Sequence, residues 1–262
     1  MKAIWRAAVL GLAALWLAAG EAPAAEVRVM NSGGFSAAYL ALAPAFETAT
    51  GNKLVIIWGP SMGTAPEAIP NRLARGEAAD VVIMVGSALG DLIKQGKVIA
   101  DSRVDLARSP IGVAVKAGAP RPDISTVEAF KRTMLDAKSM AYSDSASGVY
   151  VSRALIEKLG IADQVRGKMR QIIAERVGNV VARGEAELGF QQMSELIPVP
   201  GIDVLGPIPA EVQSITVFSA GVPVAAAEPA AGRAFIAFLA SPAAYDAIVK
   251  SGLQPIGAEA AK

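Results

Sequence analysis

Apolar residues along the chain follow two periods in turn, one of two residues and one close to a helical turn. Residues 26–30 alternate as a strand does, residues 53–58 form an apolar, β-branched run, and residues 80–85 have the composition of a buried strand. Between them, residues 35–50 have helical spacing and end at Gly51, and residues 86–96 form another helical stretch. Strands that alternate with helices indicate crossover units, so the pattern predicts an α/β fold with mainly parallel central sheets and flanking helices.

The second half of the chain continues this alternation after a change of pattern near Pro110. Strands are predicted at residues 111–115, 139–142, 187–191, 214–218 and 222–226. Helices are predicted from a capping box at residues 125–128 to about residue 135, and over residues 149–159, 176–183, 230–240 and 242–250. No solenoid repeat or low-complexity linker divides the chain.

The N-terminal residues have the pattern of an export signal. Basic Lys2 and Arg6 precede an apolar run over residues 7–19, and small residues follow at 22–25. The run is too short to favour a spanning helix, and no later stretch approaches about 20 uninterrupted apolar residues. We therefore predict a signal peptide over residues 1–25, cleaved within 22–25, and an exported, soluble periplasmic protein without stable membrane insertion. An uncleaved anchor is the alternative.

Composition excludes several classes of chemistry. The chain has no cysteine and no histidine, which removes thiol nucleophiles, the commonest general base and the commonest transition-metal ligand. A formal charge of +1, with no basic run among aromatic residues, argues against nucleic-acid binding. Any proton transfer must therefore use a carboxyl, lysine, tyrosine or hydroxyl group.

Three predicted strand-to-helix loops are rich in glycine and hydroxyl residues, at residues 31–34, 61–64 and 143–148. In open α/β sheets, ligands bind beyond the carboxyl ends of the strands, where such loops gather. Glycine allows close approach of the backbone, and hydroxyl and N–H groups can hold an anion. The alternative is that each loop is an ordinary helix N-cap with no ligand.

The order and spacing of five stretches resemble the periplasmic molybdate-binding protein family, a branch of the type II solute-binding fold. The stretches are residues 32–34, 59–63, 72–85, 143–159 and 182–190. The resemblance implies two α/β lobes with a small anionic ligand in the cleft between them. Lobe 1 would comprise residues 26–107 and 214–262, and lobe 2 residues 108–213.

The resemblance also implies which residues contact the ligand. They are Ser32, Gly33, Gly34, Ser61, Met62, Gly63, Ser147 and, with a looser match, Arg176. Arg108 and Arg153 are further candidates for a cleft arginine, although for each of the three arginines a solvated helix charge or surface ion pair is the favoured alternative. Where the molybdate binders have a tyrosine, this chain has Gln191, and a carboxamide donates and accepts through different atoms. This departure favours a polycarboxylate over a small tetrahedral oxyanion.

The chain is similar to an enzymatic branch of this family, the bacterial aconitate isomerases, in overall length, export signal and residues 184–192. That resemblance implies interconversion of cis- and trans-aconitate by an allylic proton shift, with no metal or organic cofactor. Asp144 is the first candidate for the base and Tyr142 the second, although Asp144 could instead form an Asx-turn or N-cap. The alternative function is a periplasmic component that delivers a molybdate-like oxyanion or a carboxylate to a membrane ABC transporter.

Overall fold

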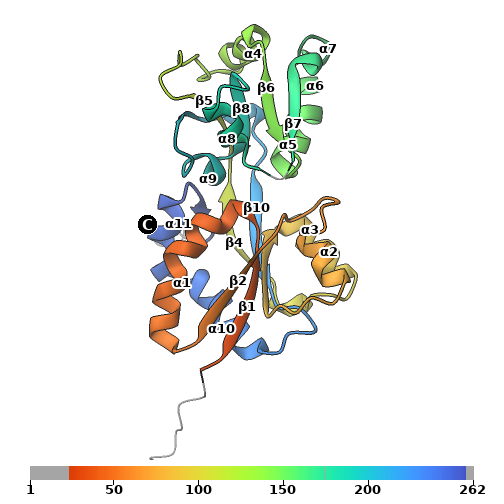
Figure 1. The fold of residues 1–262 in the computed structure, drawn as a ribbon, viewed down its shortest axis with the longest axis vertical. Coiled ribbons are helices and arrows are strands. Elements are labelled where there is room, and N and C mark those ends of the chain that lie inside the picture. Colours follow the sequence, from red (N-terminus) through yellow and green to blue (C-terminus); the bar gives the residue numbers. More distant parts are fainter. Residues whose placement is uncertain (1–23, 174, 258–262) are drawn as a thin grey trace, which may run out of the picture.

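The computed structural model describes residues 24–173 and 175–257. The predicted signal peptide lies outside the described residues except for its last two positions. The chain forms two lobes, one above the other in Figure 1, each built on its own sheet. No helix within residues 24–173 and 175–257 is long and apolar enough to cross a membrane.

The first sheet has the strand order β11-β4-β10-β3-β1-β2. Its strands are β1 (Glu26–Asn31), β2 (Lys53–Trp58), β3 (Val81–Val85), β4 (Val104–Ser109), β10 (Thr216–Gly221) and β11 (Gln254–Pro255). The second sheet has the order β7-β6-β8-β5-β9. Its strands are β5 (Ile111–Lys116), β6 (Met140–Ser143), β7 (Met169–Ile172), β8 (Leu188–Gln192) and β9 (Ile202–Pro207).

The expectation of mainly parallel sheets is wrong, because both sheets are mixed. Pairing is parallel within β2-β1-β3 and within β7-β6-β8, where helices connect successive strands. It is antiparallel where β4, β5, β9, β10 and β11 join. Strands that leave one sheet to enter the other need no helical crossover within either sheet, so they are free to pair antiparallel.

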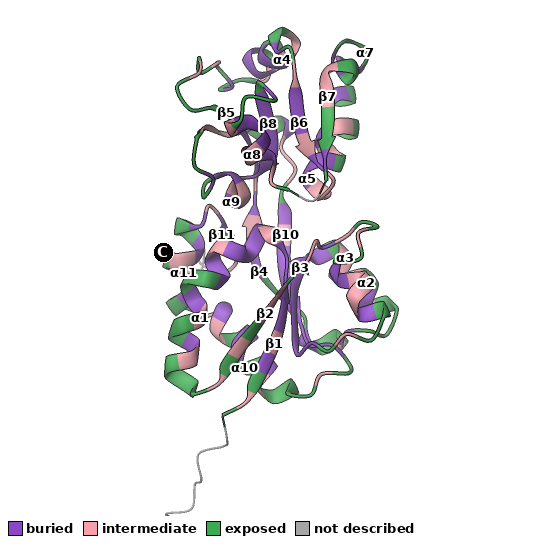
Figure 2. Cartoon of the chain, in the orientation of Figure 1, coloured by how far each residue is buried: buried purple, intermediate pink, exposed green. Residues whose placement is uncertain are grey.

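Helices cover both faces of the first sheet. They are α1 (Ser36–Thr50), α2 (Ile69–Ala74), α3 (Gly86–Lys94), α10 (Pro229–Leu239) and α11 (Pro242–Lys250). One core includes Phe46 and Phe235, whose ring centroids are 4.9 Å apart, and the other includes Met84 and Leu89. A fully buried side chain of this size stabilises the fold by about 1.5–3 kcal/mol. Figure 2 shows the result, with the central strand β3 buried and the outer faces of the helices exposed.

The second lobe has shorter helices. They are α4 (Val127–Asp136), α5 (Ala146–Tyr150), α6 (Ile156–Lys158), α7 (Ala162–Val165), α8 (Val177–Ala182) and α9 (Met193–Leu196), with a π-helical segment at Val151–Leu155 between α5 and α6. Its main core packs Phe130 against Phe190, and a smaller one lies under α8. Thr126, rather than Ser125, caps α4, because its side chain accepts a hydrogen bond from the Ala129 N–H at 3.1 Å.

Two connections join the lobes. Only Pro110 separates β4 from β5, and residues 208–215 lead from β9 to β10. Gln213 links both: its Oε1 accepts from the Ile111 N–H at 2.9 Å, and its Nε2 donates to the Ile111 and Ile208 carbonyls at 3.0 and 3.3 Å. The lobe boundary expected after residue 107 falls inside β4, which continues in the first sheet to Ser109.

Several sequence-based expectations for individual elements were wrong. Strands β4, β7 and β9 were not predicted, because their polar residues and turn-forming glycine or proline hide the strand pattern. The strand predicted at residues 222–226 is a turn, closed by a hydrogen bond from the Ala226 N–H to the Pro223 carbonyl at 3.1 Å. Pro223 has no N–H to offer a neighbouring strand, and it forms only one isolated bridge, to Val98.

Candidate active site

The first wall of the candidate site is the loop between β1 and α1. Ser32 is buried, and its N–H donates to the Ile83 carbonyl of β3 at 2.9 Å. Its hydroxyl, like the side-chain amide of Asn31, is buried without a hydrogen-bond partner among the described residues. Buried polar groups are nearly always paired, so these atoms are the clearest indication of a ligand contact in this lobe.

The two glycines of this loop have different surroundings. A Cβ on Gly34 would lie 2.1 Å from Cζ of Phe218, so the loop rests directly on that ring and only glycine fits. A Cβ on Gly33 would lie 2.6 Å from Oε1 of Glu195. Gly34 therefore serves packing, whereas Gly33 makes room for a carboxyl group from the other lobe.

Ser61 contributes a second hydroxyl from the loop after β2. It is buried, and its Oγ accepts a hydrogen bond from the Val85 N–H at 2.9 Å. The hydroxyl proton can still be donated, because this bond uses only an oxygen lone pair. The two residues that follow shape this loop. Met62 packs, partly buried, against the first core, and Gly63 has a φ of +106°, which favours glycine.

The second wall follows β6 and carries three serines. The Oγ atoms of Ser143 and Ser145 are 2.7 Å apart, and that of Ser147 lies 3.3 and 3.4 Å from them. Gly148 holds this turn tight, because a Cβ there would lie 1.6 Å from the Ser143 carbonyl oxygen. Three adjacent hydroxyls can reorient their protons toward an anion.

The two walls meet across the junction of the lobes. Arg176, which precedes α8, reaches the other lobe with Nη2 3.3 Å from Oγ of Ser36. The Ser194 hydroxyl of α9 donates to the Gly34 carbonyl at 2.7 Å, and Ala146 of α5 packs against the core of the first lobe. The structure thus brings Arg176 to the Ser32 loop, while Arg108 lies on β4 in the first sheet.

Glu195 was not predicted from the sequence, and its carboxyl group reaches from α9 to the Ser32 loop of the other lobe. Its side chain is partly buried on α9, beside Gly33. Loss of water around the carboxyl raises the pKa of Glu195 to about 7, although nearby Arg176 and a hydrogen bond from Gln191 act in the opposite direction. The negative charge of Asp144 raises the pKa further. The sequence offered one signal for Glu195, because this glutamate follows the strand that carries Gln191 by only a few residues.

Gln191, expected to contact the ligand, forms hydrogen bonds within the second lobe. It is buried, and its Oε1 accepts from the Val177 N–H at 2.9 Å, while its side chain also bonds Glu195. Both ends of the carboxamide are therefore engaged with the protein. This geometry favours a role for Gln191 in holding Glu195 in position.

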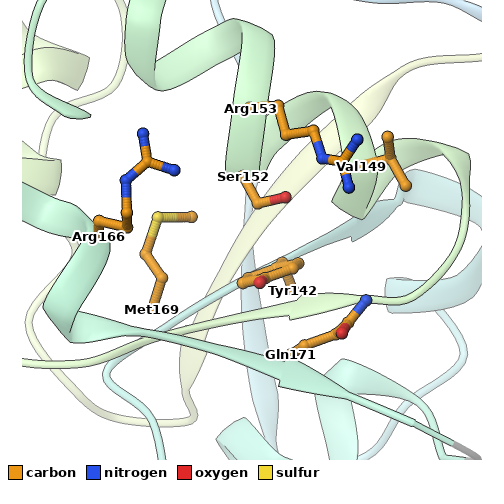
Figure 3. A pocket seen from close by; sticks show the side chains of 7 residues that line it. All are labelled: Tyr142, Val149, Ser152, Arg153, Arg166, Met169 and Gln171. Carbon is orange, nitrogen blue, oxygen red and sulfur yellow. The ribbon is translucent and has the colours of Figure 1, made fainter.

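The side chains of Tyr142 and Arg153 line a pocket that includes none of the serines of the candidate site. Figure 3 shows them around this pocket of about 210 Å³ in the second lobe, together with Arg166, Met169 and Gln171. Asp144, the first base candidate, acts on Glu195 at the junction of the lobes through its negative charge. Among residues 24–173 and 175–257, no group of His, Asp or Glu side chains is arranged to hold a metal ion.

This architecture is similar to that of known proteins. A family model described as bacterial extracellular solute-binding protein matches residues 27–254. The chain belongs to this family. The periplasmic molybdate-binding protein of Azotobacter vinelandii superposes with a TM-score of 0.70 at 22% identity, covering 87% of this chain and 98% of that one. The sulfate-binding protein SubI of Mycobacterium tuberculosis gives a TM-score of 0.69 at 18% identity, covering 90% and 89%.

These likenesses confirm the two-lobed binding-protein fold. A relative with much higher identity is an enzyme by name. The protein named aconitate isomerase from Pseudomonas sp. is 52% identical to this chain over 258 residues, which cover 97% of this chain and 98% of that protein. The expected resemblance to an isomerase branch of the family is thereby confirmed.

Proposed function

We propose that the protein is an aconitate isomerase that acts in the periplasm between its two lobes. The observation that carries this proposal is the 52% identity with the aconitate isomerase of Pseudomonas sp. across nearly the whole of both chains. The site supports it, because Gly33 of one lobe and Arg176 and Gln191 of the other lie beside a carboxyl group of raised pKa, that of Glu195. A site that only binds an anion has no need of a carboxyl group with a raised pKa.

The tricarboxylate substrate would bind between the two walls. The hydroxyls of Ser32 and Ser61 on one side, and that of Ser147 on the other, can each donate to a carboxylate oxygen. Arg176 can form a two-point contact with a further carboxylate after leaving Ser36. Donors fixed in a site with little water also stabilise the negative charge that develops during reaction.

The reaction is a proton shift with no net change in composition. A base removes a proton from the methylene group, and the electrons of that C–H bond form a new C=C bond. The electrons of the former C=C bond accept a proton at its far carbon. Negative charge in between is spread onto the neighbouring carboxylates, which the serine hydroxyls and Arg176 would hold.

The test is turnover of a defined substrate. Purified protein is incubated with cis-aconitate, and formation of the trans isomer is followed by chromatography. We expect conversion by the wild type and a 10- to 100-fold higher KM for Ser32→Ala, since a hydrogen bond to a charged group contributes about 1.5–3 kcal/mol. Exposed Ser125, changed to alanine, is the matched control and is expected to keep the wild-type KM.

A transport component that binds an anion without turnover is the second candidate. The family and the solved molybdate- and sulfate-binding structures favour it. No conversion of aconitate, combined with tight binding of molybdate, sulfate or a carboxylate in calorimetry, would establish this alternative and reject the isomerase.

A further inference from the structure

We propose that Glu195 is the acid–base group that carries the proton in the isomerisation, held in place by Gln191 and given room by Gly33. This inference rests on the proposed function and assigns its reacting group. It replaces Asp144 and Tyr142, the candidates that the sequence suggested.

The geometry places the Glu195 carboxyl where both lobes can present a substrate to it. Its helix α9 belongs to the second lobe, and Ser194 beside it is anchored to the Gly34 carbonyl of the first lobe. The carboxyl itself reaches the Gly33 position so closely that a Cβ there would be 2.6 Å from Oε1. The carboxyl therefore lies beside Gly33, and the residue before it in the chain, Ser32, has a hydroxyl that is buried and unpaired among the described residues.

The charges around Glu195 come from two elements of its own lobe. Arg176, before α8, favours the carboxylate, and Asp144, in the loop between β6 and α5, disfavours it. The facing loop of the first lobe, residues 31–36, carries no charged side chain. With the pKa of Glu195 raised to about 7 mainly by burial, the group can both accept and return a proton near neutral pH.

In this scheme a single group, the Glu195 carboxyl, serves first as the base and then as the acid. The Glu195 carboxylate accepts a methylene proton and becomes a carboxylic acid while the C–H electrons form the new C=C bond. It then gives a proton to the far carbon of the former C=C bond and returns to its starting state. No oxidant, reductant or second reactant is needed.

The other two candidates fit the geometry less well. Tyr142 lines the separate pocket in Figure 3, which contains none of the serines of the three loops. Asp144 acts on Glu195 through its charge, which raises the pKa of that carboxyl. The arrangement makes Asp144 a residue that tunes Glu195.

The experiment compares wild type, Glu195→Gln, Glu195→Asp and the control Glu128→Gln, which changes an exposed glutamate on α4. Turnover of cis-aconitate and binding of trans-aconitate are measured for each. For E195Q, we expect a kcat about 10²- to 10⁴-fold lower, with Kd within about tenfold of wild type. E195D is expected to recover at least about tenfold over E195Q, and E128Q to match wild type. The wild-type kcat/KM should rise with pH to a plateau, with its midpoint near 7.

The possible failures are distinct. Absence of turnover in the wild type would reject the proposed function and this inference together. If the wild type is active and the kcat of E195Q lies within about tenfold of the wild-type kcat, the inference alone would be rejected. If E195Q lost trans-aconitate binding along with turnover, Glu195 would be a binding residue and the inference would again be overturned.

Discussion

Replacing Glu195 by glutamine should make the folded protein more stable at alkaline pH. The folded state keeps this carboxyl partly buried, and loss of water around it raises its pKa from the ordinary 4.5 to about 7. A carboxyl with a raised pKa favours folding when it is protonated, below pH 4.5, and that contribution is lost as the pH rises through 7. Glutamine has nearly the same shape and no charge, so the loss should not occur in E195Q.

The magnitude follows from the same pKa. A pKa difference of one corresponds to about 1.4 kcal/mol, so a rise from 4.5 to about 7 sets an upper limit of about 3.5 kcal/mol at pH well above 7. The side chain is partly exposed, and solvent screening reduces the expected value to about 1–2 kcal/mol. Most of this difference should develop between about pH 5 and pH 8.5, because that interval covers most of the range between the ordinary pKa of 4.5 and the folded-state pKa of about 7.

Urea denaturation at about pH 5 and pH 8.5 measures the effect as a free energy of unfolding. Relative to wild type, E195Q should gain about 1–2 kcal/mol more at the higher pH than at the lower one. The control E128Q removes an exposed carboxyl and should show no such difference. An equal effect of E195Q at both pH values, or greater stability of wild type at pH 8.5, would refute the assignment of a raised pKa.

Three further changes test the structure around this group. Gly148→Ala should destabilise the protein by about 3 kcal/mol and abolish turnover, because a Cβ there would lie 1.6 Å from the Ser143 carbonyl oxygen; thermal unfolding measures it. Gln213→Ala should lower the free energy of unfolding by about 2 kcal/mol in urea denaturation, since it removes the side chain that bonds both inter-lobe connections. Asp144→Asn should move the midpoint of the kcat/KM pH profile to lower pH while keeping turnover, because the Asp144 charge raises the pKa of Glu195.

Each of these predictions has a control or a contrary result. Gly167→Ala is the control for G148A, because nothing lies within 4 Å of a Cβ at Gly167, and equal stability of the two variants would contradict the packing argument. Wild-type stability of a Gln213→Ala protein would show that water replaces its hydrogen bonds without loss. An unmoved or higher midpoint in D144N would contradict the coupling to Glu195, and complete loss of turnover would restore Asp144 as the base.

Elements with strong local patterns were predictable from the sequence. The strand at Lys53–Trp58 and the helix at Pro242–Lys250 have the predicted bounds, and α1 ends at Gly51, where a φ of +74° suits glycine. In contrast, β4 contains Asp105 and Arg108, which a local pattern interprets as loop residues. Their strand conformation is imposed by pairing with β10, which is more than 100 residues away in the sequence.

The sequence by itself determined the α/β class, the glycine- and serine-rich loops at strand ends and the absence of histidine and cysteine, because these depend on residue type and short-range spacing. Only the tertiary structure decided which loops come together at the junction of the lobes and which acid lies there. Glu195 gains its raised pKa from burial at a junction built by segments around residues 33, 144, 176 and 191, which come together only when the two lobes meet. Desolvation and charge proximity depend on distance in space, and neither can be read from distance along the chain.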